Sequence, residues 1–320
     1  MNWERIAILI LTLFQSSRSI LANSRSMILH IWSRRLQMAI VIIAIMGKSG
    51  KVLMVERSEI MTREELQSII SSEPYDFLRT NPHLGKNMMF LTIGGSHAYG
   101  TNIEGSDIDI RGVAFNTGRE LLGLDEFDHW VDEATDTTVF SFNKAVKLMC
   151  SGNPNMLEQL GNADDLVISY HPATKLLMDN KKLFLSRQVV YSFGGFADKL
   201  FKKAVTLGEW CNQHPEDQIT KKRMNKTIMN MIRLYLMVFD ILEKGEVITN
   251  RAENHDLLMM ARNGEFQAAN GYIKHDVKDF HKEYEKRLQY DKANTALPDT
   301  IDRNRVNELV VTINKEALKI

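Results

Sequence analysis

The stretch GGSHAYGTNIEGSDIDIRG, residues 94–112, decides how this chain is interpreted. It follows the continuous apolar run MMFLTI at 88–93, which is typical of a buried strand that ends in a tight turn. Glycines allow the backbone to turn sharply there, and exposed N–H groups together with a serine hydroxyl can receive phosphate oxygens. We therefore expect a strand and then a Gly-Gly-Ser turn, in which Gly95 and Ser96 bind the phosphates of a nucleotide.

The same stretch contains a pair of aspartates. Polar and apolar residues alternate in DIDIR, which predicts a strand over Asp107–Phe115 with Asp107, Asp109 and Arg111 on one face. Neighbouring carboxylates repel each other by about 1–4 kcal/mol at a separation of about 4 Å. A divalent cation removes this cost, and carboxylate oxygens are the ligands that Mg²⁺ and Mn²⁺ prefer. Asp107 and Asp109 are therefore predicted catalytic metal ligands.

Two further residues could complete this site. Asp136 begins a third expected strand over Asp136–Phe142 and could be a third catalytic, metal-binding carboxylate, or only the first residue of that strand. Arg111 could bind a nucleotide phosphate, or form an ion pair with one of the aspartates. A Gly-Gly-Ser sequence alone is usually only a turn, and an Asp-x-Asp pair alone is more often solvated than metal-binding. The prediction therefore depends on finding both at this spacing.

The chain changes character after the third expected strand. The acid-rich stretch 125–136 is expected to be a connection. Helical spacing of apolar residues marks 144–149, 156–160, long parts of 183–242, 251–263, 271–288 and 303–320. These patterns predict a small mixed α/β unit over residues 62–165 and a helical C-terminal region over 172–320.

The first sixty residues differ from the rest of the chain. They contain few acids and two apolar runs that are much shorter than the roughly 20 residues needed to span a bilayer. A capping box, Thr62-Arg63-Glu64-Glu65, predicts that organised structure begins there. We expect residues 1–60 to be a poorly organised leader from an upstream-extended reading frame, with Met54 or Met61 as the natural start. A membrane-associated leader is the alternative.

The composition excludes some classes of protein. Forty basic and forty acidic residues give a net charge of zero, which excludes a dedicated nucleic-acid coat but allows a local basic groove. Cys150 and Cys211 form no CxxC pair, which excludes a disulfide scaffold and a cysteine zinc site and fits a reducing compartment. We expect a cytoplasmic protein with no stable membrane insertion.

Together the motifs resemble the signature of the DNA polymerase β superfamily of nucleotidyltransferases: a Gly-Ser turn, Asp-x-Asp about ten residues later, and an acid on a later strand. Over about residues 85–265 the chain resembles the RNA-repair-pathway branch of these predicted enzymes. The motifs that carry this resemblance are GSHAYG (95–100), SDIDIRG (106–112), GNPNMLE (152–158), IRL (232–234) and ARNGE (261–265). The resemblance implies an α+β fold, with a small twisted mixed sheet flanked by helices and an α-helical C-terminal region.

The resemblance also implies roles for individual residues. Gly95 and Ser96 would bind the nucleoside triphosphate, and Asp107, Asp109 and Asp136 would hold the metal ions. Asp132 and Glu133 are close enough in sequence to replace Asp136 as the third carboxylate. The role of His97 stays open, because arginine is expected at least as often at that place.

These features predict a metal-dependent nucleotidyltransferase that transfers a nucleoside monophosphate from a nucleoside triphosphate, such as ATP, to an acceptor hydroxyl. The resembled branch suggests an RNA 3′ end as the acceptor; a protein or a small molecule is the alternative. A basic helix face could bind RNA or could be only a solvated surface, and it comprises Lys221, Lys222, Arg223, Lys226 and Arg233. An inactive nucleotide-sensing or partner-binding module on the same fold stays open, and an Asp-x-Asp glycosyltransferase is disfavoured by the Gly-Gly-Ser spacing.

Overall fold

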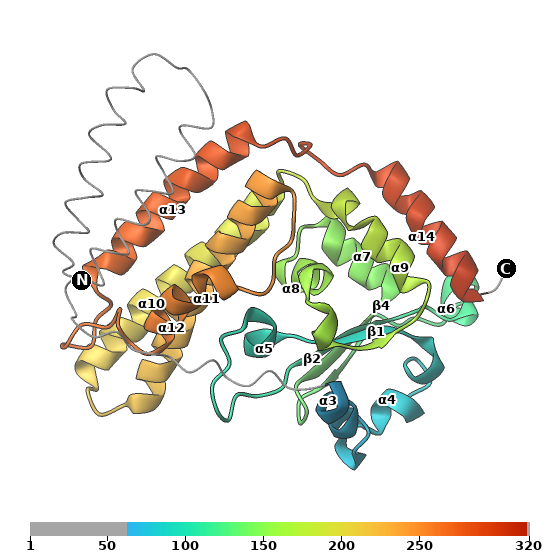
Figure 1. Ribbon diagram of the computed structural model, residues 1–320, viewed down its shortest axis with the longest axis horizontal. Coiled ribbons are helices and arrows are strands. Elements are labelled where there is room, and N and C mark those ends of the chain that lie inside the picture. Colours follow the sequence, from blue (N-terminus) through green and yellow to red (C-terminus); the bar gives the residue numbers. More distant parts are fainter. Residues whose placement is uncertain (1–62, 319–320) are drawn as a thin grey trace, which may run out of the picture. The chain divides into compact units, whose positions relative to one another are not determined.

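The strand expected before the Gly-Gly-Ser turn is present: in the computed structural model the run MMFLTI forms β1 (Met88–Ile93). All of its residues except Met88 are buried, because helices cover both faces of the sheet (Figure 1). The structure describes residues 63–318, so the expected leader at 1–60, both candidate start positions and the helix cap at Thr62 lie outside the described residues.

Five strands form one mixed sheet in the order β3-β4-β2-β1-β5. β1 pairs antiparallel with both β2 (Ile110–Ala114) and β5 (Val167–Tyr170). β2 pairs parallel with β4 (Thr137–Ser141), and β4 pairs antiparallel with the edge strand β3 (His129–Asp132). A mixed sheet with flanking helices and a helical C-terminal region confirms the predicted α+β fold class.

Two features of the sheet differ from the sequence-based prediction. β2 begins at Ile110, whereas residue alternation predicted a strand from Asp107. β3 lies inside the stretch 125–136 that was predicted to be a connection. Three of its four residues are exposed, because an edge strand faces solvent, so it lacks the apolar alternation by which a half-buried strand is found.

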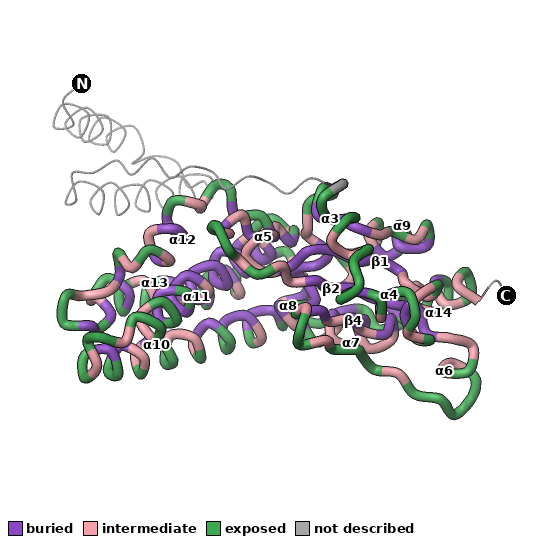
Figure 2. Tube along the Cα trace, turned by 90° about the horizontal axis from the view of Figure 1, so that it is seen from below, coloured by how far each residue is buried: buried purple, intermediate pink, exposed green. Residues whose placement is uncertain are grey.

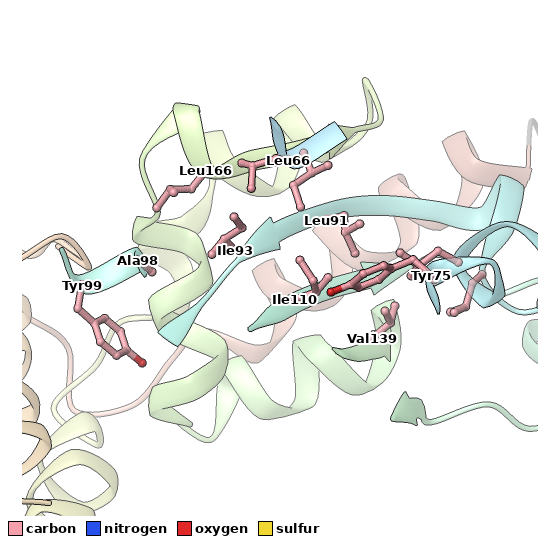
Figure 3. Close-up of a cluster of buried hydrophobic side chains, with 13 residues drawn as sticks. Leu66, Tyr75, Leu91, Ile93, Ala98, Tyr99, Ile110, Val139 and Leu166 are labelled. Carbon is pink, nitrogen blue, oxygen red and sulfur yellow. The ribbon is translucent and has the colours of Figure 1, made fainter. Parts of the chain in front are cut away.

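Helices pack against both faces of the sheet. α3 (Arg63–Ile70) and α4 (Phe77–Thr80) lie on one side, and α7 (Phe142–Cys150) and α9 (Thr174–Asp179) lie on the other (Figure 1). A core of buried side chains fills the space between the sheet and the first pair of helices (Figure 3). Its strand members include Leu91, Ile93, Ile110, Val139 and Ile168.

The C-terminal half consists mainly of four helices: α10 (Gly195–Gln213), α11 (Gln218–Lys244), α12 (His255–Arg262) and α13 (His275–Asn294). α11 is buried along much of its length (Figure 2), and this includes the apolar face predicted from sequence, Met229, Ile232, Leu236 and Phe239. The last helix, α14 (Arg303–Leu318), returns to the sheet half and packs against α9. It also contacts α7, where Asn143 Oδ1 accepts a hydrogen bond from Asn314 Nδ2 at 3.1 Å.

Short helical segments complete the described part of the chain. They are α5 (Gly95–Tyr99), α6 (Gly118–Leu122), α8 (Pro154–Leu157), the π-helical η6 (Val190–Gly194), and the 3₁₀ turns η1 (Glu73–Tyr75), η2 (Gly85–Asn87), η3 (Glu158–Gly161), η4 (Asp164–Leu166), η5 (Lys181–Phe184) and η7 (Ala252–Asn254).

The described residues all belong to one compact unit. A division into two domains, 62–165 and 172–320, therefore stays a prediction. Among the helices that the structure describes, none combines the length and the apolarity needed to cross a membrane.

Candidate active site

The Gly-Gly-Ser turn joins β1 to α5 directly beside Asp109. The N–H of Gly94 donates to the Asp109 carbonyl at 2.8 Å, which continues the pairing of β1 with β2 beyond the strand ends. Gly95 has a φ of 60°, and a Cβ built on it would lie 1.7 Å from Oδ2 of Asp109. Glycine is therefore required at position 95 by the left-handed backbone and by the close approach of the carboxylate.

Ser96 follows in the first turn of α5. Its carbonyl accepts a hydrogen bond from the N–H of Thr101 at 2.9 Å, which closes this short helix, and Gly100 caps it with a φ of 69°. The Ser96 hydroxyl bonds to no residue in the described range. It is therefore available to a ligand at the edge of the sheet where Asp109 lies.

Parallel pairing of β2 with β4 brings a second acid to this edge. Ile110 is paired with Thr137, so the residues that precede the two strands, Asp109 and Asp136, are neighbours. Arg111 joins them: its Nη2 lies 2.8 Å from Oδ1 of Asp109 and 3.2 Å from Oδ1 of Asp136. Its Nη1 also donates to the Asp136 carbonyl at 2.5 Å. Two predicted site acids, each the residue before a strand, are thus in direct contact with one guanidinium.

The two carboxyl groups differ in pKa. The pKa of Asp109 is raised to about 6, first because burial disfavours its charged form and second because it hydrogen-bonds to Asp136. The pKa of Asp136 is lowered: partial burial opposes this, but the hydrogen bond with Asp109 and the charge of Arg111 outweigh it. Two adjacent acids of this kind are destabilising in isolation and favourable when a cation is bound between them.

This donor set fits a divalent cation. Mg²⁺ is usually held by one or two carboxylates together with substrate phosphates. Asp109 and Asp136 supply two carboxylates, and the turn at Gly95 and Ser96 lies against one of them.

Asp107 does not join this pair. It is exposed in the loop before β2, and within the described range no hydrogen bond or ion pair links it to Asp109 or Asp136. Nor do residues 63–318 contain a group of three His, Cys, Asp or Glu side chains close enough to hold a metal ion. The three predicted carboxylates are therefore not assembled into one cluster, because β2 begins at Ile110 and the strand ladder does not fix the orientation of Asp107. Metal binding by Asp107 stays a prediction.

The alternatives to Asp136 lie elsewhere. Asp132 ends β3 and accepts hydrogen bonds from the backbone N–H and the hydroxyl of Thr135, at 2.9 Å and 2.8 Å, which stabilises the β3–β4 turn. Glu133 is exposed. Of the three acids, Asp136 is the one that lies beside Asp109. Arg111 is engaged as an ion-pair partner, and its contact with a nucleotide phosphate stays a prediction.

A buried ion pair, which sequence reasoning missed, anchors α5 to the helical half. The hydroxyl of Tyr99, the last residue of α5, donates to Glu158 at 3.0 Å. Nη1 of Arg233, on α11, lies 3.0 Å from the same carboxylate, and the Arg233 guanidinium carbon lies 3.6 Å from the centroid of the Tyr99 ring. The position of α5 thus depends on both halves of the chain.

Arg233 consequently does not belong to the predicted basic surface face. It is only 4% exposed, because it neutralises the buried Glu158. An arginine within the apolar stretch of α11 is the sequence signal that could have revealed a buried partner. Lys222, Arg223 and Lys226 are exposed on α11, and the charge of Lys226 acts to lower the pKa of both site acids. Of this basic face, Lys226 is therefore the residue whose charge reaches the acid pair.

Comparison with known proteins gives one strong match. The family model described as "RNA repair pathway DNA polymerase beta family" matches residues 59–312. No curated protein matches the chain. Among solved structures, a nucleotidyltransferase-like protein from Exiguobacterium sibiricum is 8% identical, with 79% of this chain and 78% of that chain covered and a TM-score of 0.25. At this identity and score the structural likeness carries no weight of its own, and the family match is the finding that bears on identity.

Proposed function

The chain belongs to the RNA repair pathway DNA polymerase beta family, and on this basis we propose that it is a metal-dependent nucleotidyltransferase. It transfers a nucleoside monophosphate from a nucleoside triphosphate to an acceptor hydroxyl and releases pyrophosphate. The observation that supports this most strongly is the contact between the Gly95 backbone and the Asp109 carboxylate. Nucleotidyl transfer needs a phosphate-binding turn and cation-binding acids side by side.

In the proposed reaction the acceptor oxygen forms a bond to the α-phosphorus while the bond from that phosphorus to the pyrophosphate oxygen breaks. The acceptor proton passes to a carboxylate of the Asp109–Asp136 pair, and the electron pair of the broken bond leaves with pyrophosphate. Ser96 and the first N–H groups of α5 hold the triphosphate, and Arg111 fixes the orientation of both carboxylates. Bound Mg²⁺ or Mn²⁺, with Asp107 as a further ligand, would neutralise the acids and spread the charge that develops on the phosphates.

We infer that the acceptor is an RNA end and that the enzyme acts in the cytoplasm, where nucleoside triphosphates and RNA are both present. The description of the family supports RNA. The exposed cations Lys222, Arg223 and Lys226 on α11 support it as well, because they could bind the phosphate backbone of a strand whose end reaches the acid pair.

Transfer of label tests the proposal. The protein is incubated with each α-labelled nucleoside triphosphate, with Mg²⁺ or Mn²⁺, and with either total RNA or cell protein. We expect label on RNA with the wild-type chain, none with Asp109→Asn, and full labelling with the control Asp165→Asn, which changes an exposed acid in η4. Label on protein would show that the acceptor is a protein and not RNA. Use of nucleotide sugars alone would exclude the proposed activity.

An inactive nucleotide-sensing module is the second candidate. One observation favours it: Arg111 already bridges both acids, so an internal cation already offsets part of the charge that a metal ion would neutralise. Tight binding of nucleoside triphosphate without release of pyrophosphate, under every metal and acceptor condition, would support the sensor over the enzyme.

A further inference from the structure

Arg262, the last residue of α12, is a half-buried cation without an acidic partner in the described part of the chain. Its Nη2 lies 3.4 Å from the Ser106 hydroxyl, and its Nη1 is buried without any hydrogen-bond partner. Burial alone lowers its pKa. A buried charge without a counter-charge is costly. We therefore expect the Arg262 side chain to gain an anionic partner when the protein binds its ligand.

The surroundings of Arg262 belong to the site that carries the aspartates. Ser106 directly precedes Asp107, and its backbone lies close enough to the ring of His97, on α5, to act on the pKa of that histidine. Nε2 of His97 is also buried without a partner, and burial, together with the charge of Arg262, lowers the pKa of this histidine. Unpartnered nitrogen atoms from α5 and α12 thus converge on the loop that leads to the acids.

The end of α12 is also held against α11. Gly264 has a φ of 89°, and a Cβ built on it would lie 2.8 Å from Nδ2 of Asn225. Asn225 precedes Lys226, whose charge acts on Asp109 and Asp136. Of the two cations from the helical half, Arg262 thus contacts the loop that leads to the acids, and Lys226 acts on the acids through its charge.

We propose that Arg262 is a phosphate-binding residue of this site: its guanidinium donates to non-bridging oxygens of the triphosphate of the bound nucleotide, and Lys226 neutralises the same group. This assignment depends on the proposed function, since it names the residues that receive the donor substrate. It gives Arg262 the role that the sequence pattern suggested for Arg111, whose donors are engaged by Asp109 and Asp136. Guanidinium groups bind phosphate oxygens through paired hydrogen bonds, which makes arginine suited to this place.

Binding and stability measurements together test the proposal. The probes are the α,β-methylene analogue of ATP with Mg²⁺, which is not cleaved, and inorganic tripolyphosphate; the variants are Arg262→Met and Arg262→Lys. The control is Arg305→Met, which removes an exposed arginine of α14. We expect Arg262→Met to weaken binding of both probes tenfold or more, a change equivalent to about 1.4 kcal/mol, with Arg262→Lys intermediate and Arg305→Met unchanged.

Stability separates this role from a structural one. Removal of an unpaired buried charge should leave the thermal midpoint of the ligand-free protein unchanged or raised. A lowered midpoint with unchanged affinity for both probes would make Arg262 structural and overturn the proposal. Weaker binding of an RNA oligonucleotide alone, with unchanged affinity for tripolyphosphate, would also overturn it, because the phosphate would then belong to the acceptor. A wild-type chain that binds neither probe contradicts the proposed function as well, whereas equal binding by wild type and Arg262→Met contradicts only the role of Arg262.

Discussion

The α-carbon of Gly95 faces the carboxylate of Asp109 with no room for a side chain between them. This contact joins the first residue of α5 to the last residue of the loop 101–109, which leads into β2. The loop begins after the left-handed residue Gly100, and β1 and β2 are antiparallel neighbours, so the end of one strand and the start of the other meet at one edge of the sheet. The contact is therefore a consequence of the β1–β2 pairing.

Replacement of Gly95 by alanine should lower the rate of nucleotidyl transfer at least a hundredfold. The new Cβ would overlap the Asp109 carboxylate and displace it from Asp136. The matched control is Gly105→Ala, because Gly105 also has a positive φ, 75°, but nothing lies within 4 Å of its added Cβ. Both variants should lose about 1–2 kcal/mol of stability from backbone strain, and Gly95→Ala should lose more because its Cβ also overlaps the Asp109 carboxylate. Transfer assays and thermal unfolding distinguish them; equal activity of the two variants would show that the contact is unimportant.

Asp109→Asn should stabilise the metal-free protein at neutral pH while it removes activity. Asparagine places no second negative charge beside Asp136, yet its amide oxygen can still accept the hydrogen bond from Arg111. A gain of about 1 kcal/mol raises the midpoint by about 2–4 °C in a chain of this size. Calorimetry without metal checks this. A lower midpoint in the variant would mean that the acid pair is not a source of repulsion.

The raised pKa of Asp109 also predicts how stability changes with pH. Its folded-state value of about 6 lies above the ordinary 3.8, so between these values the folded protein binds more protons than the unfolded chain. The contribution of Asp109 to the free energy of unfolding therefore falls as pH rises from 4 to 6. The lowered pKa of Asp136 acts below this window. Subtracting the denaturation profile of Asp109→Asn from that of the wild type should isolate the slope; a difference that is constant between pH 4 and 6 would contradict the raised value.

Breaking the buried ion pair should be far more damaging than removing it whole. Arg233→Met leaves Glu158 charged and buried, at a cost of about 3–5 kcal/mol. The double variant Arg233→Met/Glu158→Gln should recover most of that loss. Lys175→Met, which breaks an exposed pair with Asp179, should cost less than about 1 kcal/mol. Denaturant unfolding of the wild type, Arg233→Met, Glu158→Gln and the double variant gives the coupling between the two residues. A loss in the double variant equal to the sum of the two single losses would show that they are not coupled.

Mg²⁺ should stabilise the wild-type protein and have no effect on Asp109→Asn. Binding to the folded state alone raises the free energy of unfolding by RT ln(1 + [L]/Kd), so the midpoint should rise with metal concentration and rise further with a nucleoside triphosphate. The variant Asp107→Asn tests whether Asp107 is also a metal ligand. If Asp107 is a metal ligand, as predicted, its variant should also lose the response; an unchanged response would leave the site to Asp109 and Asp136.

Local features of the site could be predicted from the sequence. β1 was predicted with its observed bounds, because a short apolar run before two glycines has few other solutions. The adjacency of Asp109 and Asp136 depends on β2 and β4 pairing in parallel across an intervening hairpin strand, which no local pattern specifies. No local pattern specifies the surroundings of Arg233 and Arg262 either, because both lie on helices that are distant in sequence from the acids. Tertiary packing buries Arg233 against Glu158 and leaves Arg262 without a counter-charge.

Helix α5 has a further consequence. It is five residues long; its first residue touches Asp109, and its last is clamped by Glu158 and Arg233, while the Tyr99 carbonyl also accepts from the N–H of Arg251 at 3.0 Å. A helix of five residues that is held at both ends cannot absorb a movement of its neighbours. A movement of α11 against the sheet would therefore be passed through Arg233 and Tyr99 to α5, and would alter the separation between Gly95 and the Asp109 carboxylate.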